Sequence, residues 1–364
     1  MFSQIRVQNF RGIKSLKIDG LARLNIFIGE NGCGKTSLLE SLMILGNRAA
    51  PQLLLNLAAW RDQPRASPQF DVPLRCFFFN LDPRVRISLG ATGEHGERGL
   101  EISAIFGDYG TIPAVGGQDE QKPGDIFEPG PPATTGEDRI GGVLYRILPR
   151  TTGDNMRAIL TPQGLLQPQP PFLVASGDPG AFYVHARRAT SLNETANVLT
   201  DLAQERLEEM LYELLRTVNP KVRGLWAGVR GGQTAVLADL GEQLRRMPIQ
   251  LLGDGFCRIC LIATGLAGRN AKMVIVDEID SGLHYSTMPG FWQGVAAMCS
   301  QCKVQLFCST HNEEMLRALV KAFPEGTNDV AIFRLDRQVD GNVEPTRYDT
   351  EMLRTAEKID VEVR

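Results

Sequence analysis

The chain has 364 residues, of which 43% are hydrophobic and 22% are charged, a composition typical of a soluble globular protein with one large domain or two modest ones. Its formal net charge of −3 excludes a strong overall attraction to nucleic acid or acidic membranes, and no apolar run approaches the roughly 20 residues of a membrane span. The first residues predict a strand rather than a signal peptide, so we expect a cytoplasmic protein with no membrane partner.

The seven cysteines fit a reducing compartment, where thiols stay free. Four of them form two C-x-x-C pairs, Cys257 with Cys260 and Cys299 with Cys302. Each pair has two interpretations, a pair of buried thiols on an apolar helix face or a pair of zinc ligands. The apolar residues around the first pair recur at helix spacing, which favours buried thiols there.

The most informative motif is G-E-N-G-C-G-K-T at residues 29–36, which matches the phosphate-binding pattern G-x-x-x-x-G-K-[ST] at every fixed position. Residues 1–28 are predicted to form antiparallel strands that lead into this loop, with an apolar strand at 24–28, and residues 37–43 predict the helix that follows. The motif requires this context. We therefore predict that ATP is bound by Asn31, Gly32, Cys33, Gly34, Lys35, Thr36 and Ser37.

The chemistry of phosphate binding explains the composition of the loop. Glycines let the backbone turn so that several N–H groups point at one phosphate, and the start of the next helix adds the positive end of its dipole. Lys35 supplies a positive charge near the β- and γ-phosphates, and the hydroxyl of Thr36 can ligate Mg²⁺. The alternative, a chance glycine-rich turn, leaves the complete match unexplained.

The middle of the chain predicts many elements but carries few motifs. The segment 107–142 is rich in glycine, proline and acidic residues, so we predict a mobile loop. This loop is either an insertion without a function or a docking site for a partner. Residues 221–246 carry several basic side chains that either contact phosphate backbones or stay solvated. The other predicted elements are helices at 52–61, 190–218 and 256–266 and strands at 73–81, 85–89, 100–106, 142–148 and 182–184.

Two later strands end in polar residues. Residues 273–276 are predicted to form an apolar strand followed by Asp277, which would hold Mg²⁺, and Glu278, which would polarise the attacking water. Residues 304–310 predict another strand, and His311 just beyond it can contact the γ-phosphate. The alternatives are an ordinary strand with an acidic end and a structural loop histidine, but the phosphate loop upstream favours catalytic roles for Glu278 and His311.

These motifs together resemble the ABC-type ATPases of the RecF/SMC/OLD group, and most nearly their stand-alone bacterial branch of AAA-type, OLD-like ATPases. The resemblance rests on the phosphate loop, on the stretch 277–284 and on the stretch 309–312. It also rests on the opening stretch 7–13, whose Arg11 the resemblance places near the nucleotide phosphates. It covers residues 1–45 and 240–320, roughly the two ends of the chain.

The resemblance implies the fold class, an α/β P-loop NTPase with an ABC-type head. Such a head has a mostly parallel central sheet, an antiparallel N-terminal lobe and a helical subdomain. Residues 1–364 would form a single head with an inserted lobe at 46–240, and a strand pair at 331–335 and 343–348 followed by a helix would close it without a second catalytic module. The predicted helix at 190–218 is too short to be the heptad-repeat arm of an SMC protein.

The resemblance also gives a role to the glycine bend at 252–258, which occupies the place of the ABC signature. In the family this loop opens a helix and binds the γ-phosphate held by a second subunit, here through Gly253, Asp254 and Gly255. The sequence departs from the usual serine-glycine-glycine pattern, because it offers no hydroxyl and adds the charge of Asp254. The implied assembly is an ATP-dependent homodimer, paired head to tail, or a higher assembly.

The implied activity is the hydrolysis of ATP to ADP and phosphate, with ATP and Mg²⁺ as cofactors. The compact resemblance favours the regulatory or sensor ATPase of a bacterial antiphage defence system that controls a separate effector, such as a nuclease or toxin. The alternative is a RecF-like ATPase that binds DNA in repair or recombination. A transporter's ATP-binding subunit is disfavoured by the mismatched signature and the long middle region.

Overall fold

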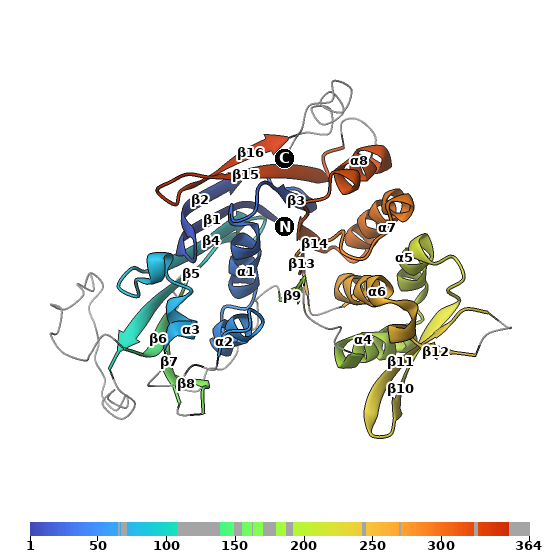
Figure 1. Ribbon diagram of the computed structural model, residues 1–364, viewed down its shortest axis with the longest axis horizontal. Coiled ribbons are helices and arrows are strands. Elements are labelled where there is room, and N and C mark those ends of the chain that lie inside the picture. The colour runs from blue at the N-terminus through green and yellow to red at the C-terminus, as the bar shows by residue number, and fades with distance from the viewer. Residues whose placement is uncertain are drawn as a thin grey trace.

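A computed structural model describes residues 1–64, 66, 71–107, 139–148, 155–161, 163–169, 180–186, 192–241, 245–268, 271–323 and 327–348. Helix α1 (Lys35–Gly46) lies between two large sheets, and a group of helices lies on the far side of the central sheet from α1 (Figure 1). The loop predicted at 107–142, apart from its two ends, and the helix predicted after residue 348 lie outside the described residues. Within the described ranges, no helix is both long and apolar enough to cross a bilayer.

The central sheet has six strands in the order β16-β15-β3-β14-β13-β9. All neighbours pair in parallel except the edge strand β16, which is antiparallel to β15. This arrangement confirms the prediction of a mostly parallel central sheet. β3, β13 and β14 are buried along their whole length, as expected for strands covered on both faces. The strands are β3 (Leu24–Ile28), β9 (Ala181–Val184), β13 (Met273–Val276), β14 (Gln305–Ser309), β15 (Val330–Arg337) and β16 (Val343–Tyr348).

A seven-stranded antiparallel sheet, in the order β2-β1-β4-β5-β6-β7-β8, forms the predicted antiparallel lobe. Leu38 and Leu42 of α1 share one buried core with Val7 of this sheet and Ile275 and Phe307 of the central sheet. Helix α1 is therefore packed between the two sheets, which fixes the position of the phosphate loop at its start. The strands are β1 (Phe2–Phe10), β2 (Ile13–Asp19), β4 (Ile87–Gly93), β5 (Gly96–Phe106), β6 (Ile140–Leu148), β7 (Asn155–Leu160) and β8 (Leu166–Gln169).

The other face of the central sheet is covered by helices, seen on the right of Figure 1. A second core joins Val274 and Leu306 of the sheet to apolar side chains of these helices and of a small three-stranded sheet. The helices are α4 (Leu192–Glu205), α5 (Glu209–Val218), α6 (Asp254–Ala267), α7 (Met288–Gln301) and α8 (Glu313–Ala322). The small sheet consists of β10 (Gly224–Arg230), β11 (Gln233–Asp239) and β12 (Met247–Pro248).

Two predicted elements are wrong. The strand expected at 73–81 is a short helix, α3 (Val72–Arg75), followed by a 3-10 turn at Phe79–Leu81, because a short apolar run does not distinguish a buried helix from a strand. Asp71 anchors this helix with its carboxylate, which accepts hydrogen bonds from Arg75 Nε at 3.0 Å and Ile140 N at 2.7 Å. The single helix expected at 190–218 is two helices, since Arg206 adopts a left-handed φ of 57° between α4 and α5.

The helix predicted at 52–61 is confirmed as α2 (Gln52–Ala59). The strand expected at 85–89 begins two residues later and runs further, as β4, because it pairs along its full length with β1 and β5. The helix expected at 256–266 is α6, which starts at Asp254, directly after Gly253.

Candidate active site

The phosphate loop, Asp277 and His311 lie together because they follow neighbouring parallel strands. β3 ends at Ile28 just before the loop, β13 ends just before Asp277, and β14, which lies between them, ends two residues before His311. In an open parallel sheet, the carboxyl ends of the strands meet at one edge, where ligands bind. The hydroxyl of Thr36 lies 3.1 Å and 3.3 Å from the two carboxylate oxygens of Asp277. The structure therefore brings together the two predicted metal ligands.

The phosphate loop is held in shape by its glycines and by Lys35. Gly34 has a φ of 111°, a left-handed conformation that a side chain disfavours, and a Cβ on Gly29 would lie 2.5 Å from the carbonyl oxygen of Leu335. The ammonium of Lys35, on a residue 5% exposed, donates hydrogen bonds to the carbonyls of Gly29 at 2.6 Å and Glu30 at 2.8 Å. Burial lowers the pKa of Lys35, and the charges of the thiol of Cys33 and the nearby carboxylates oppose that shift.

Asp277 and Glu278 are linked by one hydroxyl. Ser309, which is 1% exposed, donates its Oγ–H to Asp277 Oδ1 at 2.7 Å and accepts a hydrogen bond from the backbone N–H of Glu278 at 2.8 Å. Glu278 has a left-handed φ of 53°, an uncommon conformation for a side chain of this size, and its side chain is exposed. The hydroxyl of Ser309 thus positions both the carboxylate of Asp277, the predicted metal ligand, and the strained backbone of Glu278, the predicted catalytic residue.

A partly buried arginine also holds the backbone at Asp277 and Glu278. Arg258, on α6, donates hydrogen bonds to the carbonyls of Asp277, Glu278 (3.1 Å) and His185 (3.0 Å). Burial lowers the pKa of Arg258, while the carboxylates of Asp277 and Glu278 oppose this shift. Sequence reasoning did not assign this role, because the contact joins a helix to two strand ends that are distant in the chain. A polar residue four positions into an otherwise apolar helix was the available signal.

Replacing Ser309 with alanine should lower the rate of ATP hydrolysis by about 10- to 100-fold, the usual effect of losing a group that orients a metal ligand. The substitution leaves the N–H of Glu278 and one carboxylate oxygen of Asp277 without their partner. Phosphate release at saturating ATP measures the effect. The matched control is Ser41→Ala, because Ser41 is equally buried and donates to the carbonyl of Leu38 within α1. Equal losses in the two variants would contradict the proposed role of Ser309.

His311 lies at the rim of the site and is exposed. Partial burial lowers its pKa below the ordinary value of 6.5, and the positive charge of Lys35 lowers it further. The imidazole is therefore neutral at pH 7, so that it can donate one hydrogen bond without adding a charge. This state suits the predicted contact between His311 and a γ-phosphate, although the role itself stays a prediction.

A cavity of about 550 Å³ opens at this edge of the sheet. Its size is within the range of small-molecule sites, roughly 300–1,000 Å³. Cys33 is buried in the loop behind it, where its sulfur accepts a hydrogen bond from Lys35. The predicted residues that line it are Arg11, Asn31, Gly32, Gly34, Lys35, Thr36, Ser37, Glu278 and His311. The lining residues that sequence reasoning did not identify include Arg61, Asn80 and Arg337.

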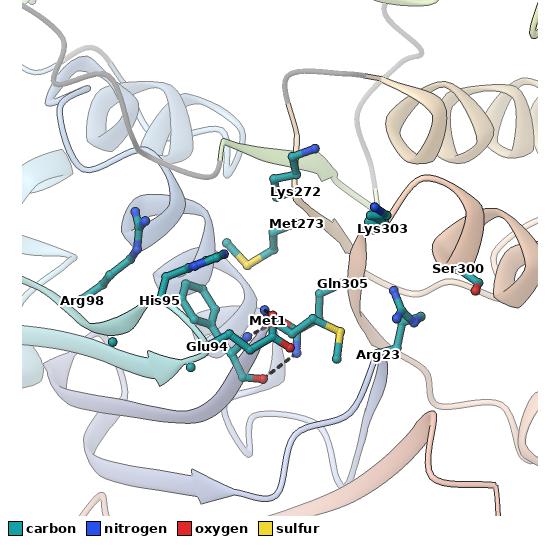
Figure 2. A pocket seen from close by; sticks show the side chains of 13 residues that line it. Met1, Arg23, Glu94, His95, Arg98, Lys272, Met273, Ser300, Lys303 and Gln305 are labelled. Atoms are coloured by element: carbon teal, nitrogen blue, oxygen red, sulfur yellow. Dashed lines mark hydrogen bonds and ion pairs between the residues drawn. The ribbon is translucent and has the colours of Figure 1, made fainter.

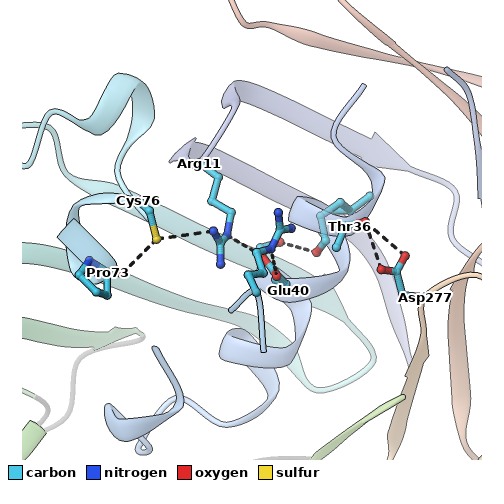
Figure 3. Close-up of polar contacts among 9 residues, drawn as sticks. Arg11, Thr36, Glu40, Pro73, Cys76 and Asp277 are labelled. Atoms are coloured by element: carbon cyan, nitrogen blue, oxygen red, sulfur yellow. Dashed lines mark hydrogen bonds and ion pairs between the residues drawn. The ribbon is translucent and has the colours of Figure 1, made fainter. Parts of the chain in front are cut away.

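Arg11 reaches the cavity wall but is committed to an ion pair (Figure 3). Its Nε lies 2.5 Å from Oε2 of Glu40, and its guanidinium stacks 4.3 Å from the centre of the ring of Phe77. The other carboxylate oxygen of Glu40 accepts a hydrogen bond from Nε of Arg61 at 2.7 Å. Glu40 is fully buried one turn after Thr36 on α1, so two arginines on the cavity wall share one carboxylate beneath it.

Replacing Glu40 with alanine should lower the free energy of unfolding by about 3–5 kcal/mol, because both arginines lose the partner of a buried ion pair. Denaturant unfolding followed by circular dichroism measures the loss. The control is Glu314→Ala, since Glu314 is exposed on α8 and should change stability by less than about 0.5 kcal/mol. A similar small change for Glu40→Ala would show that the buried pair contributes little.

The predicted signature residues lie apart from this cavity. The described residues that line it do not include Gly253, Asp254 or Gly255. Gly253 has a φ of 92° at the start of α6, and a Cβ on Gly255 would lie 2.0 Å from the carbonyl oxygen of Gly282. The structure therefore brings the start of α6 and the stretch 277–284, on which the resemblance also rests, into backbone contact within one chain.

The two C-x-x-C pairs occupy the helical side of the molecule. Cys257 and Cys260 are buried on α6, and the thiol of Cys257 donates to the carbonyl of Ile249 at 3.3 Å. Cys299 is buried on α7, and Cys302 follows the end of that helix. The described part of the chain contains no group of three or more His, Cys, Asp or Glu side chains placed to hold a metal ion.

Two family models match the segments that form the site. Residues 1–91, which contain the phosphate loop, match the model described as AAA ATPase domain. Residues 180–317, which contain Asp277, Glu278 and His311, match the model described as AAA domain, putative AbiEii toxin, Type IV TA system. The phosphate loop therefore lies in one match, and Asp277, Glu278 and His311 lie in the other.

Relatives and solved structures are similar to the chain at low identity. An ATP/GTP phosphatase of Helicobacter pylori is 23% identical over 347 residues, which cover 89% of each chain. The DNA replication and repair protein RecF of Hahella chejuensis is 52% identical over 48 residues, but the match spans only 13% of each chain. The Smc head domain of Pyrococcus furiosus, solved with an extended coiled coil and bound to the C-terminal domain of ScpA, matches with a TM-score of 0.52 at 11% identity over 99% of each chain. The chain therefore has an SMC head-like ATPase fold, with its candidate site formed by two segments that match AAA domain models.

Proposed function

We propose that the protein is a Mg²⁺-dependent ATPase. The observation that carries this proposal is the placement of the Thr36 hydroxyl beside the carboxylate of Asp277, at the start of the helix that follows a complete phosphate loop. Hydroxyl and carboxylate oxygens are the ligands that Mg²⁺ prefers, and this ion takes its remaining ligands from substrate phosphates and water. The residues present therefore fit the ion. When bound, Mg²⁺ would neutralise charge on the phosphate oxygens.

The side chains divide the work of hydrolysis between them. Lys35 would exchange its hydrogen bonds with the carbonyls of Gly29 and Glu30 for phosphate oxygens, which accept charge-assisted hydrogen bonds. Glu278, exposed beside the cavity, would accept a hydrogen bond from the attacking water and draw off its proton. His311, at the rim of the cavity, would donate a hydrogen bond to the terminal phosphate.

Phosphate release tests the ATPase proposal directly. The purified protein should release phosphate from ATP in the presence of Mg²⁺ and stop when EDTA removes the metal. Thr36→Ala removes a proposed metal ligand and should reduce turnover, whereas Thr217→Ala, a change of the same kind on α5, should not. Turnover that is equal with and without Mg²⁺ would refute the proposal.

We infer that ATP joins two copies of the chain head to tail. The signature residues do not contribute to their own cavity in the described structure, which leaves one side of the nucleotide for a second subunit to complete. The start of α6 after Gly253 offers backbone N–H groups and the positive end of a helix dipole. A two-fold dimer would use the same surface on both copies. Light scattering should show a dimer with ATP and a monomer without it.

We propose, as the biological role, a regulatory ATPase of a bacterial antiphage defence system that controls a separate effector, of the OLD-like kind. The description of the second family model, which names a putative AbiEii toxin of a type IV toxin–antitoxin system, supports this setting. The test is native mass measurement of the protein with and without ATP, alone and mixed with the product of the neighbouring gene. An ATP-dependent complex supports the role, and the lack of any complex argues against it.

The 52% identical stretch shared with RecF favours a second candidate, an ATPase that closes on DNA. This function predicts DNA binding that depends on ATP and weakens steeply with salt, because phosphate contacts release counterions. Fluorescence anisotropy with a labelled duplex at two salt concentrations tests it. A pure protein that ignores DNA with and without ATP would remove this candidate.

A further inference from the structure

A second cavity, of about 670 Å³, lies at the opposite edge of the central sheet from the candidate active site (Figure 2). The parallel strands β3, β13 and β14 run from this edge to the active site. Arg23 stands just before β3, Lys272 just before β13 and Lys303 two residues before β14, and all three line the cavity. His95 in the turn between β4 and β5 and Arg98 near the start of β5 close the other side.

The floor of this cavity is built and rigid. Gln305, which is 3% exposed, accepts a hydrogen bond from the backbone N–H of Phe2 at 2.8 Å and donates to the carbonyls of Phe2 and Ala22, each at 2.8 Å. These bonds tie the start of β1 to the start of β14, so the two sheets are fixed relative to each other at this point. The buried side chain of Met273 lies beside Gln305 and closes the floor, and the partly buried side chain of Phe2 adds an apolar surface. A preformed apolar floor with a few polar groups is the usual form of a small-molecule site.

The walls of the cavity are positively charged, although the chain as a whole is acidic, with a net charge of −3. The described lining residues include Arg23, Arg98, Lys272 and Lys303 but a single acid, Glu94, which pairs with the α-amino group of Met1 at 3.1 Å. Both lysines are exposed at the cavity rim. Several cations converging on one apolar hollow favour an anion that also has an apolar part.

The backbone at Lys303 supports a selected role for this side chain. Lys303 has a left-handed φ of 55° just after α7, a position that glycine fills at the lowest conformational cost. The residue that bears this backbone strain is also one that lines the cavity. Strain of this kind is a reason to look for a function of the residue that bears it.

We propose that this cavity binds a nucleoside phosphate, distinct from the nucleotide of the active site. The phosphate would be held by Lys272 and Lys303, and the flat base would lie against the partly buried ring of Phe2. Arg23, which donates a hydrogen bond to the carbonyl of Cys299 at 3.2 Å, would add positive charge beside the two lysines. The volume suits a single nucleotide unit. This unit could be a free nucleotide or the phosphorylated end of a nucleic-acid strand, which present the same chemistry to the cavity.

Calorimetric titration with ADP tests the proposal by counting sites. The wild-type chain should bind two ADP molecules. Lys272→Glu/Lys303→Glu should bind one, with the second site weakened at least about tenfold by the loss of two charged contacts. Lys17→Glu/Lys321→Glu, which makes the same charge change at exposed positions elsewhere, should keep both sites. One site in the wild-type chain that Lys35→Ala removes, or two sites in the Lys272/Lys303 variant, would overturn the proposal.

A second variant guards against misfolding. Lys303→Gly removes the ammonium and also relieves the strained φ, so it should melt at or above the temperature of the wild-type chain while its second site weakens. Unchanged ADP binding by this stable variant would also overturn the proposal. If the active site itself fails to bind nucleotide, the wild-type chain would bind one ADP that Lys35→Ala keeps and Lys272→Glu/Lys303→Glu loses, so the two failures are distinguishable.

Competition identifies the source of the phosphate. A short strand carrying a 5′-phosphate should displace ADP from the second site if strand ends are the natural ligand, whereas the same strand without the phosphate should not. If free nucleotides are the natural ligand, the phosphorylated strand should compete only weakly compared with unlabelled ADP, and the strand without the phosphate should not compete. Displacement by both strands equally would show that the cavity recognises the polymer rather than a nucleoside phosphate, and would overturn the proposal.

Discussion

Glu278→Gln should lower the rate of ATP hydrolysis by about 10²- to 10⁴-fold while ATP binding is retained, because a carboxamide cannot take a proton from the attacking water. The backbone of Glu278 is held by the hydroxyl of Ser309 and the guanidinium of Arg258, so the amide should occupy the place of the carboxylate. Bound ATP that is not hydrolysed should then trap the head-to-tail dimer. Phosphate release and light scattering, measured on the same sample, check both results.

The matched control for this variant is Glu30→Gln. Glu30 is an exposed acid in the phosphate loop, and its contact with Lys35 uses the backbone carbonyl, which the substitution keeps. The control removes the same charge close to the same cavity, so it should hydrolyse ATP at nearly the wild-type rate. Full turnover by Glu278→Gln would show that another group activates the water.

Lys35→Ala should weaken the affinity for ATP by about 100-fold or more and thereby abolish binding at ordinary ATP concentrations. Each charged hydrogen bond to phosphate contributes about 1.5–3 kcal/mol, and every 1.4 kcal/mol is a factor of ten in affinity. The ammonium of Lys35 has at least two such bonds to exchange, those to the carbonyls of Gly29 and Glu30. Titration with a fluorescent ATP analogue measures the loss.

The alanine variant also loses the hydrogen bonds from Lys35 to the carbonyls of Gly29 and Glu30, so the folding of this variant is measured separately. Thermal unfolding should still show one cooperative transition, because the lost hydrogen bonds of Lys35 lie within the phosphate loop while the two sheets keep their buried cores. Lys321→Ala, an exposed lysine on α8, is the control for loss of a positive charge. Tight ATP binding by a folded Lys35→Ala protein would refute the assignment of the phosphate loop.

The features that the sequence predicted well are local ones. The phosphate loop is a contiguous motif whose glycines, lysine and threonine each have a fixed place, and the apolar strands before Asp277 and His311 are continuous runs. Their meeting at one edge follows from the rule for parallel sheets, so the pairing of Thr36 with Asp277 was predictable from the residues alone. The short strand β9 was also predicted, but not its place beside β13 in the central sheet.

The features that the sequence did not predict depend on distant contacts. Arg61 and Arg337 reach the cavity from elements with no motif of their own, and Arg258 supports the catalytic turn from a helix on the far side of the sheet. The helix α3 replaced an expected strand because Asp71 binds Arg75 and the backbone of β6, a contact that no local pattern reveals. The break between α4 and α5 at Arg206 was likewise not predicted, because no glycine or proline marks it in the sequence.

The contact between Gly255 and Gly282 gives the molecule a mechanical property. Because the two backbones touch with no side chain between them, a shift of the start of α6 would act directly on the loop that follows Glu278. Arg258 on the same helix donates a hydrogen bond to the carbonyl of Glu278, which is a second contact between α6 and this loop. Under the proposed head-to-tail pairing, a tilt of α6 imposed by the second copy would therefore shift Glu278, the proposed catalytic residue, and would couple dimerisation to hydrolysis.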